Sequence, residues 1–141
     1  MDYVVHVDAK SNEMEKILDK TKKTIIRGAA GRKMPYGRVN PGDKLYFINN
    51  NGEGIIKATA EVNDVFNSEK MSKEDSTNLV RENQDKLQLS EQQFKRWAGK
   101  RYIVLINVEN VESLDPFKID KSNYRNMDDW LLVEDIENVK K

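Results

Sequence analysis

The chain has 141 residues, 38% hydrophobic and 34% charged, which is enough for one compact domain with a core of its own. Its 24 basic and 24 acidic residues give zero net charge, which excludes a uniformly basic nucleic-acid-binding protein but not a polarised surface. The absence of cysteine excludes disulfides and thiolate chemistry, and no apolar run approaches the roughly 20 residues of a membrane span. The start, Met-Asp-Tyr-Val, lacks a signal-peptide pattern, so a cytoplasmic protein without membrane contact is expected.

The first half of the chain is predicted to be mainly β-structure. Residues 56–62 alternate between apolar and polar types, which is typical of a strand with one buried and one solvent-facing side. Residues 40–43, Asn-Pro-Gly-Asp, and the Asn-Gly pair at 51–52 predict turns. The strands expected in this half lie at residues 3–7, 24–26, 44–48 and 56–62.

One helix is expected within this half. Met14, Ile17 and Leu18 would share one face of it, and Ser11 is predicted to cap its start. The lysines up to Lys23 suit its C-terminal end, because cations favour the negative pole of a helix.

The second half mixes helices and strands. Ser72 is predicted to cap a helix that ends near Asn83, and residues 90–93 form a capping-box pattern for a helix that ends near Gly99. Residues 102–108 are almost continuously apolar, which predicts a central strand covered on both faces. Further short elements are expected at residues 114–117, 130–133 and 136–139. This order predicts a mixed sheet or small barrel with helices at its rim.

Positive charge is concentrated between residues 20 and 44, where eight basic residues face one acid, Asp43. Acidic residues elsewhere in the chain, notably at 134–137, offset this excess. The result is a one-sided positive potential, which attracts phosphates without making the whole protein basic.

The loop at 28–38 carries the features of a ligand contact. Residues 28–31, Gly-Ala-Ala-Gly, permit a close approach of the backbone to a ligand, and the nearby arginines can hold phosphate with two hydrogen bonds. Tyr36 offers a flat face for a base, a contact worth about 1–3 kcal/mol. The glycine spacing does not match a P-loop, so hydrolysis of nucleoside triphosphates is not indicated. The alternative is a charged loop that is merely solvated.

Three other residues are weaker candidates. His6 is the single histidine and lies within a predicted strand, so we interpret it as a surface or core residue, and no metal site or cofactor is predicted. Trp97 and Trp130 can each form the wall of an aromatic pocket, although both also suit packing. Trp130 is the better pocket candidate of the two, because it lies where a loop enters a strand beside charged residues.

Several short motifs follow one another in the order of these elements. They are Ile17-Leu18, Lys-Lys-Thr-Ile at 22–25, Arg27, and the segments 39–47 and 60–62. In this order they resemble the ASCH domain family of the PUA-like superfamily. The resemblance covers residues 1–66, and the apolar run at 102–108 fits a later barrel strand. It implies a single α+β domain over residues 1–141, a small PUA-like mixed β-barrel with peripheral helices, and a role in binding RNA or reading modified bases.

One branch of this family consists of small amidohydrolases that deacetylate acetylcytidine with a lysine, a threonine and a glutamate. The resemblance places Lys23 at the lysine and Glu82 at the glutamate. Ile26 occupies the position of the threonine, and isoleucine has no hydroxyl to act as a nucleophile. An amidohydrolase acting on an acylated nucleoside is therefore the alternative function, and binding without catalysis is favoured.

The favoured interpretation is a module that binds RNA or a modified nucleotide through its basic loop, at the mouth of a barrel cleft. The arginines and lysines would contact phosphate, and the aromatic residues would stack on a base. A protein-interaction module with no nucleic-acid role is a third interpretation, and nothing in the sequence indicates an oligomeric state. The predicted binding residues are Lys23, Thr24, Arg27, Arg32, Lys33, Tyr36, Arg38 and Trp130.

Overall fold

A computed structural model describes residues 1–120 and 129–141, in which six strands, four α-helices and a 3₁₀ helix are found. The strands are β1 (Asp2–Val7), β2 (Thr24–Ala29), β3 (Lys44–Asn49), β4 (Ile55–Asn67), β5 (Tyr102–Lys118) and β6 (Trp130–Glu134). The helices are α1 (Glu13–Leu18), α2 (Lys73–Glu82), α3 (Gln84–Leu87), α4 (Glu91–Trp97) and the 3₁₀ helix η1 (Ile136–Asn138).

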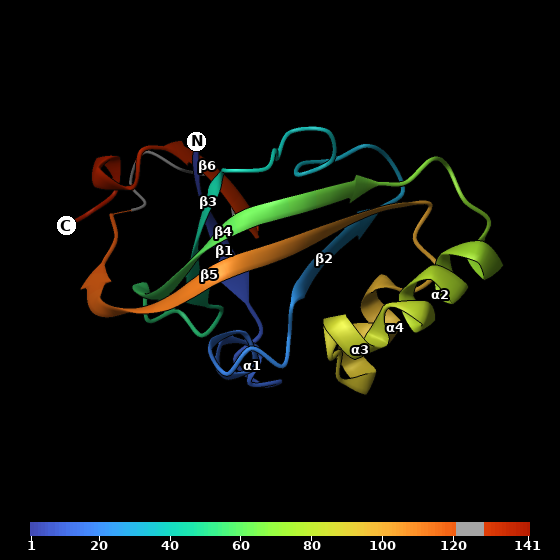
Figure 1. The fold of residues 1–141 in the computed structure, drawn as a ribbon, viewed down its shortest axis with the longest axis horizontal. Coiled ribbons are helices and arrows are strands. Elements are labelled where there is room, and N and C mark those ends of the chain that lie inside the picture. Colours follow the sequence, from blue (N-terminus) through green and yellow to red (C-terminus); the bar gives the residue numbers. More distant parts are fainter. Residues whose placement is uncertain (121–128) are drawn as a thin grey trace.

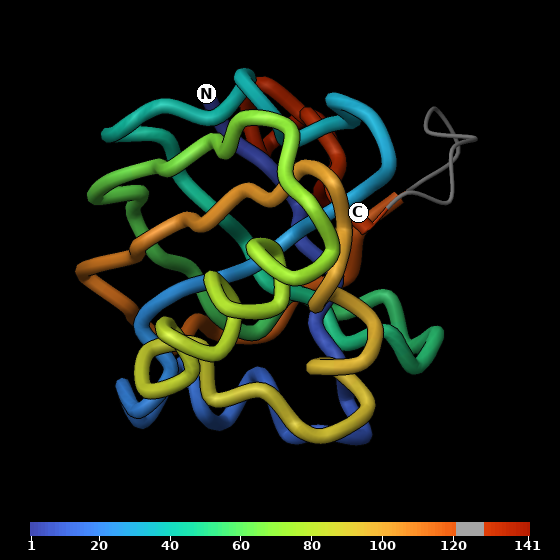
Figure 2. The backbone as a smooth tube through the Cα atoms, turned by 90° about the vertical axis from the view of Figure 1, so that its right-hand side faces the viewer, coloured from blue at the N-terminus to red at the C-terminus, as the bar shows by residue number. Residues whose placement is uncertain are grey.

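All six strands belong to one mixed sheet with the order β2-β5-β4-β3-β1-β6. β1 and β3 pair in parallel, and the other neighbours are antiparallel. The sheet curls into a half-barrel, with α2, α3 and α4 grouped at one end (Figures 1 and 2). This architecture confirms the predicted α+β fold, a small mixed barrel-like sheet with peripheral helices.

Strands β2 and β5 are covered on both faces, as the apolar run at 102–108 predicted. Ile25 and Val104 pack into the core inside the curled sheet, whereas Ile26 and Leu105 pack against the helices. Because successive side chains of a strand point to opposite faces, two adjacent apolar residues pack into two different hydrophobic cores. A fully buried isoleucine contributes about 1.5–3 kcal/mol, so Ile25 and Ile26 anchor the strand that leads into the basic loop.

Two of the three predicted serine caps, at Ser72 and Ser90, are confirmed. The Ser72 hydroxyl accepts a hydrogen bond from the Asp75 backbone N–H at 3.1 Å and starts α2. Ser90 accepts from the Gln93 N–H at 3.2 Å, while the Gln93 side chain accepts from the Ser90 N–H at 3.1 Å. This reciprocal capping box fixes the start of α4, which carries Trp97 at its other end.

The predictions around α1 are wrong in two respects. The N-cap is Asn12, with a φ of 54°, and the Ser11 hydroxyl instead donates to the Asp8 carboxylate at 2.8 Å. The helix ends at Leu18, before the lysines that were expected to complete it. Lys22 lies beyond that end and is buried, with its ammonium donating to the Leu87 carbonyl oxygen.

Several boundaries also differ from the sequence prediction. The element expected at 114–117 is the end of β5, and β4 runs to Asn67 instead of 62. The pairing of β4 with β5 contains register shifts, which bend the two strands. This bend lets the long strand pair follow the curvature of the sheet. The short α3 was not predicted, and residues 136–138 form a 3₁₀ helix. Among the described residues, no helix has the length and apolar character needed to cross a membrane.

Candidate functional site

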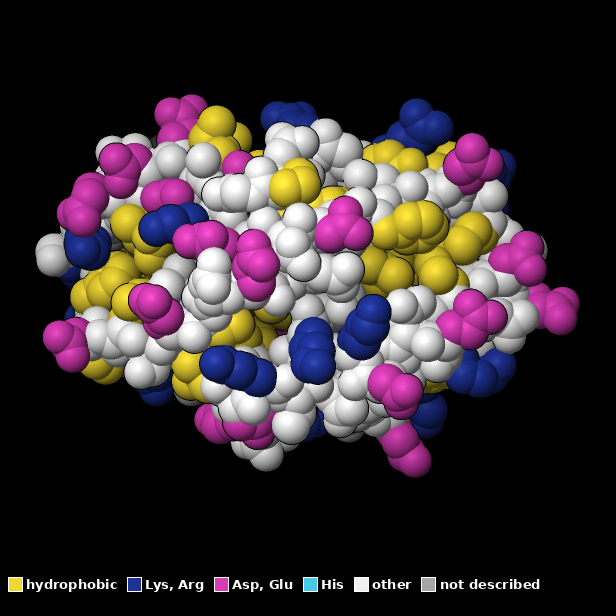
Figure 3. Space-filling model, viewed as in Figure 1, with side chains coloured by type: hydrophobic (Ala, Val, Ile, Leu, Met, Phe, Trp, Pro, Cys, Tyr) yellow, Lys and Arg dark blue, Asp and Glu magenta, His cyan; other side chains and the backbone are white. Residues whose placement is uncertain are grey.

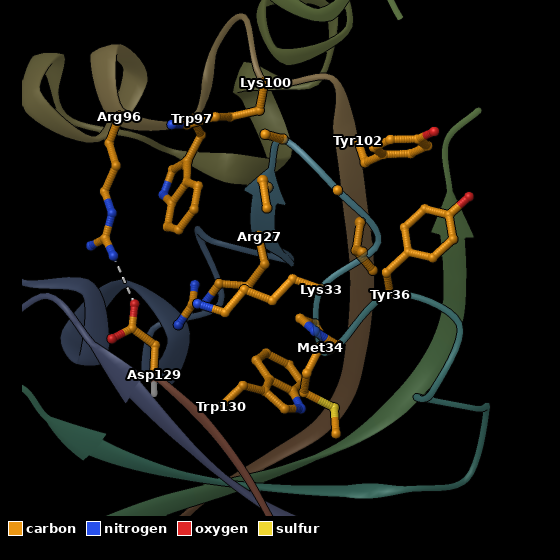
Figure 4. Close-up of a pocket in the computed structure, with 16 residues that line it drawn as sticks. Arg27, Lys33, Met34, Tyr36, Arg96, Trp97, Lys100, Tyr102, Asp129 and Trp130 are labelled. Carbon is orange, nitrogen blue, oxygen red and sulfur yellow. Dashed lines mark hydrogen bonds and ion pairs between the residues drawn. The ribbon is translucent and has the colours of Figure 1, made fainter. Parts of the chain in front are cut away.

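A cavity of about 400 Å³ lies where the loop after β2 meets the end of α4 and the starts of β5 and β6 (Figure 4). Four segments that are distant in the sequence therefore contribute to one site. Its lining combines the backbone of residues 28–31, aromatic rings and long basic side chains. The side chains that line it include Arg27, Lys33, Met34, Tyr36, Arg96, Trp97, Lys100, Tyr102, Asp129 and Trp130.

Arg27 lies between two indole rings in this cavity. Its guanidinium carbon is 5.5 Å from the Trp97 ring centroid and 5.6 Å from that of Trp130, within the range of cation–π attraction. Two of its nitrogens donate to backbone carbonyls, one to Ile26 at 2.7 Å and one to His6 at 2.6 Å. These contacts fix the side chain, so the two indoles form walls around a rigid cation.

Burial is the main influence on the electrostatics of Arg27, which is 8% exposed. Desolvation lowers the pKa of its guanidinium, and the Glu13 and Asp129 carboxylates act in the opposite direction. Because an arginine stays protonated in proteins, the pocket contains a fixed positive charge that water screens poorly.

A second aromatic pair forms the other end of the cavity. The rings of Tyr36 and Tyr102 meet edge to face, with centroids 5.6 Å apart and planes at 84°. The Arg32 guanidinium carbon lies 5.7 Å from the first ring and 5.6 Å from the second. The Tyr36 hydroxyl donates to the Ser68 carbonyl oxygen, which ties the basic loop to the end of β4. This end of the site is therefore held in place from two elements.

Further basic side chains surround these rings. Lys33, Arg96 and Lys100 line the cavity, and Arg96 pairs with Asp129 at 2.8 Å across its edge. Gly28 explains how Lys100 comes close, because a Cβ at Gly28 would lie 3.1 Å from the Cβ of Lys100. A glycine at this position of β2 therefore allows the strand to pack closely against the turn before β5.

The face of the molecule in Figure 3 carries both acidic and basic side chains, with a group of basic ones below the centre. A protein with zero net charge can hold an anion best where its cations are gathered. The cavity, with basic side chains from β2, the loop after β2, α4 and the turn before β5, is such a place.

Two buried nitrogens at the cavity lack hydrogen-bond partners among residues 1–120 and 129–141. They are Nε of Arg27 and Nε1 of Trp130, and both residues line the cavity. Unpaired buried donors are rare in folded proteins and each costs about 1–3 kcal/mol. Both belong to side chains that line the cavity, so a hydrogen-bond acceptor brought close to them would relieve this cost.

Two further cavities differ from the first in their lining. One, of about 200 Å³, adjoins the first through shared residues such as Arg27 and Trp97, and is lined by polar side chains including Glu13 and Gln93. The other, of about 550 Å³, is lined by Lys20, Lys22 and Lys23 together with residues 108–112 of β5. The second has Arg27, Arg96 and Trp97 but none of the lysines and tyrosines of the first, and the third has lysines without aromatic rings. Within the described ranges, no His, Asp and Glu side chains are grouped as a metal site requires.

Four of the residues predicted from the sequence to bind meet at the first cavity: Arg27, Lys33, Tyr36 and Trp130 line it directly. Arg32 lies over the tyrosine pair at the cavity's end. Trp130 is 3% exposed and packs against Tyr3, with ring centroids 6.0 Å apart, so it forms a wall with one face already covered.

The structure places the other predicted residues elsewhere. The exposed Lys23 side chain lines the third cavity, and the buried Thr24 hydroxyl donates to Asn107 Oδ1 at 2.6 Å. Arg38 is exposed outside the first cavity, and its carbonyl oxygen accepts from the Tyr3 hydroxyl at 2.9 Å. Glu82 is the exposed last residue of α2 and lines none of the three cavities, so it does not share a cavity with Lys23.

Sequence reasoning missed the contribution of the segment between α4 and β5. Trp97 was ranked below Trp130, and Arg96, Lys100 and Tyr102 were not singled out, yet all four line the cavity. A signal was present, because residues 95–102, Lys-Arg-Trp-Ala-Gly-Lys-Arg-Tyr, twice place an aromatic residue directly after two basic ones.

Comparisons with known proteins were made with both sequence and structure. No protein-family model matches the chain, and no curated protein sequence does either. Among solved structures, an ASCH protein from Zymomonas mobilis superposes with a TM-score of 0.68 at 14% identity, covering 97% of this chain and 92% of that one. A serine-to-alanine mutant of the same protein gives 0.66 at 15% identity, covering 94% and 89%.

A further neighbour is the N-terminal domain of McrB from Staphylothermus marinus, with a TM-score of 0.50 at 12% identity, covering 98% of this chain and 92% of that one. At such identities a likeness shows the fold alone. These superpositions confirm the predicted ASCH-type fold over most of the chain.

Proposed function

We propose that this protein binds RNA or a modified nucleotide by taking one base into the cavity between β2, α4, β5 and β6. The observation that carries the proposal is the convergence of aromatic rings and basic side chains on one cavity of about 400 Å³. Stacking on an aromatic face contributes about 1–3 kcal/mol per base, and lysine or arginine supplies the attraction for the backbone phosphate.

The division of roles follows from position. Trp97 and Trp130, whose rings already contact Arg27, would offer their edges to a base, and the tyrosine pair would offer faces or edges. Lys33, on the loop after β2, and Lys100, in the turn before β5, would contact a phosphate. The walls are fixed by hydrogen bonds of Arg27 and Tyr36 to backbone carbonyls, so little ordering is required on binding. A footprint of one base and its adjacent phosphates fits the zero net charge better than a long groove does.

Fluorescence anisotropy with a short labelled single-stranded RNA tests this function. We expect binding that weakens with salt, and a Lys33→Ala variant with lower affinity and a salt dependence shallower by about one phosphate contact. Tyr36→Ala should weaken binding by five-fold or more, as the loss of about 1 kcal/mol or more of stacking requires.

The matched control for Lys33→Ala is Arg38→Ala, since both remove one exposed positive charge from the same loop and only Lys33 lines the cavity. Lys23→Ala serves the same purpose at the third cavity. If these controls weaken binding as much as Lys33→Ala, the RNA contacts the basic segment broadly and not through this cavity. An RNA affinity that is immeasurable at low salt would contradict the proposed function.

A further inference from the structure

We infer that the cavity selects bases that present keto oxygens, guanine and uracil, over bases that present an amino group in the same place, adenine and cytosine. This specificity rests on the proposed function, because it concerns the same cavity. It follows from the hydrogen-bonding character of the side chains that line the cavity.

The polar side chains of the lining are dominated by groups that can only donate. Arginine, lysine and tryptophan have no acceptor, and Arg27, Lys33, Arg96, Trp97, Lys100 and Trp130 all belong to these types. The lining carboxylate, Asp129, already accepts from Arg96 at 2.8 Å. The Tyr36 and Tyr102 hydroxyls point away from Arg27 (Figure 4).

Two of these donors are buried and unpartnered within the described parts of the chain. Nε of Arg27 belongs to a residue that is 8% exposed, and Nε1 of Trp130 to one that is 3% exposed. They come from different strands, β2 and β6, and the two side chains are in cation–π contact. A ligand that brings acceptors to this corner satisfies both donors, and one that brings another donor leaves them unpaired in a desolvated place.

Nucleobases differ in whether they present a hydrogen-bond acceptor or an amino group at equivalent positions. Guanine presents O6 beside N7, both acceptors, where adenine presents an amino group beside N7. Uracil likewise has an O4 acceptor where cytosine has an amino group. A lining dominated by donor side chains therefore disfavours the amino bases, because their N–H₂ group meets few side-chain acceptors and loses its hydration.

The test compares matched pairs of mononucleotides by isothermal titration calorimetry on the intact chain. GMP should bind more tightly than AMP, and UMP more tightly than CMP, by on the order of tenfold in each pair. Ribose 5-phosphate, which carries the phosphate but no base, should bind more weakly than GMP and UMP. Equal or reversed affinities within the pairs would overturn the inference, as would ribose 5-phosphate binding as tightly as GMP, because the donors would then take the phosphate.

Should the mononucleotides bind too weakly to measure, the same comparison is made with oligouridine and oligocytidine. Binding of both without preference contradicts the specificity alone and leaves the proposed function standing. Failure of every nucleotide and oligonucleotide to bind contradicts the proposed function, and the specificity with it.

A spectroscopic measurement locates the contact without a mutation. The chain has two tryptophans, so two indole N–H signals are expected in a ¹H–¹⁵N spectrum. The Trp130 signal should shift on saturation with GMP, and shift less with AMP, because a new acceptor changes the environment of that proton. An unchanged Trp130 signal in the presence of saturating GMP would overturn the inference.

Trp130→Phe supplies a variant that keeps an aromatic ring and removes the donor. The preference for UMP over CMP should fall toward equality while CMP binding persists. Trp97→Phe is the matched control, since it makes the same change on the opposite side of Arg27 and leaves the Trp130 donor in place. A preference that survives in Trp130→Phe and disappears in Trp97→Phe would contradict the assignment.

Discussion

Raising the pH from 7 to 9.5 should stabilise the fold through Lys22. The Lys22 ammonium is fully buried, donates to the Leu87 carbonyl oxygen and lies 3.5 Å from Glu13 Oε2. Burial lowers the pKa of Lys22 from its ordinary 10.5 to about 8, although Glu13 partly opposes this. The unfolded chain therefore holds this proton more tightly than the folded chain, and folding becomes more favourable as pH rises between about 8 and 10.5. Linkage gives a gain of about 2 kcal/mol between pH 7 and 9.5.

Urea denaturation followed by circular dichroism at several pH values measures this gain. The reference is a Lys22→Met/Glu13→Gln double variant, which removes the titrating lysine without leaving a buried carboxylate unpaired. Other groups, such as the tyrosines Tyr3 and Tyr46 whose pKa values are raised by burial, titrate in both proteins and cancel in the difference. The wild type should gain about 2 kcal/mol on the reference by pH 9.5. A difference in unfolding free energy that stays constant with pH would refute the reasoning.

Three further predictions concern Gly28 and Arg96, which line the cavity, and Ser90, which caps α4. Gly28→Ala should weaken RNA binding several-fold in an anisotropy titration, because the new Cβ would lie 3.1 Å from the Cβ of Lys100 and displace that side chain; unchanged affinity would count against a role for Lys100. Ser90→Ala should lower the unfolding free energy by about 1 kcal/mol in urea, and an unaltered midpoint would mean that the capping box of α4 contributes nothing. Arg96→Ala should change the unfolding free energy by no more than about 1 kcal/mol, since its pair with Asp129 is exposed, and a larger loss would show that this pair supports the fold.

Local patterns were sufficient to predict much of the fold. The caps at Ser72 and Ser90 depend on hydrogen bonds within three residues, and the adjacent isoleucines of β2 encode two buried faces by simple alternation. The basic loop also pointed to the correct part of the chain for Lys33 and Tyr36, which line the cavity.

The features of the fold and the cavity that were not predicted from the sequence depend on contacts between distant segments. Lys22 looked like a helix-terminal surface residue, and its burial requires the Leu87 carbonyl 65 residues away. The contribution of Trp97 and Lys100 depends on how α4 packs against β2, which no local pattern contains. Charge density along the chain also does not say which way a side chain points, so Lys23 and Arg38 appeared equivalent to Lys33 and lie outside the cavity.

Tryptophan fluorescence is the most direct test of the central claim, that a base enters the cavity formed by β2, α4, β5 and β6. Both tryptophans of the chain, Trp97 and Trp130, line this cavity, so a stacked base should quench the emission. Titration with a mononucleotide is predicted to give saturable quenching, lost in high salt and absent with ribose 5-phosphate. Emission that stays unchanged with millimolar mononucleotide and with a short single-stranded RNA, in a protein that is folded by circular dichroism, would show that no base enters this cavity.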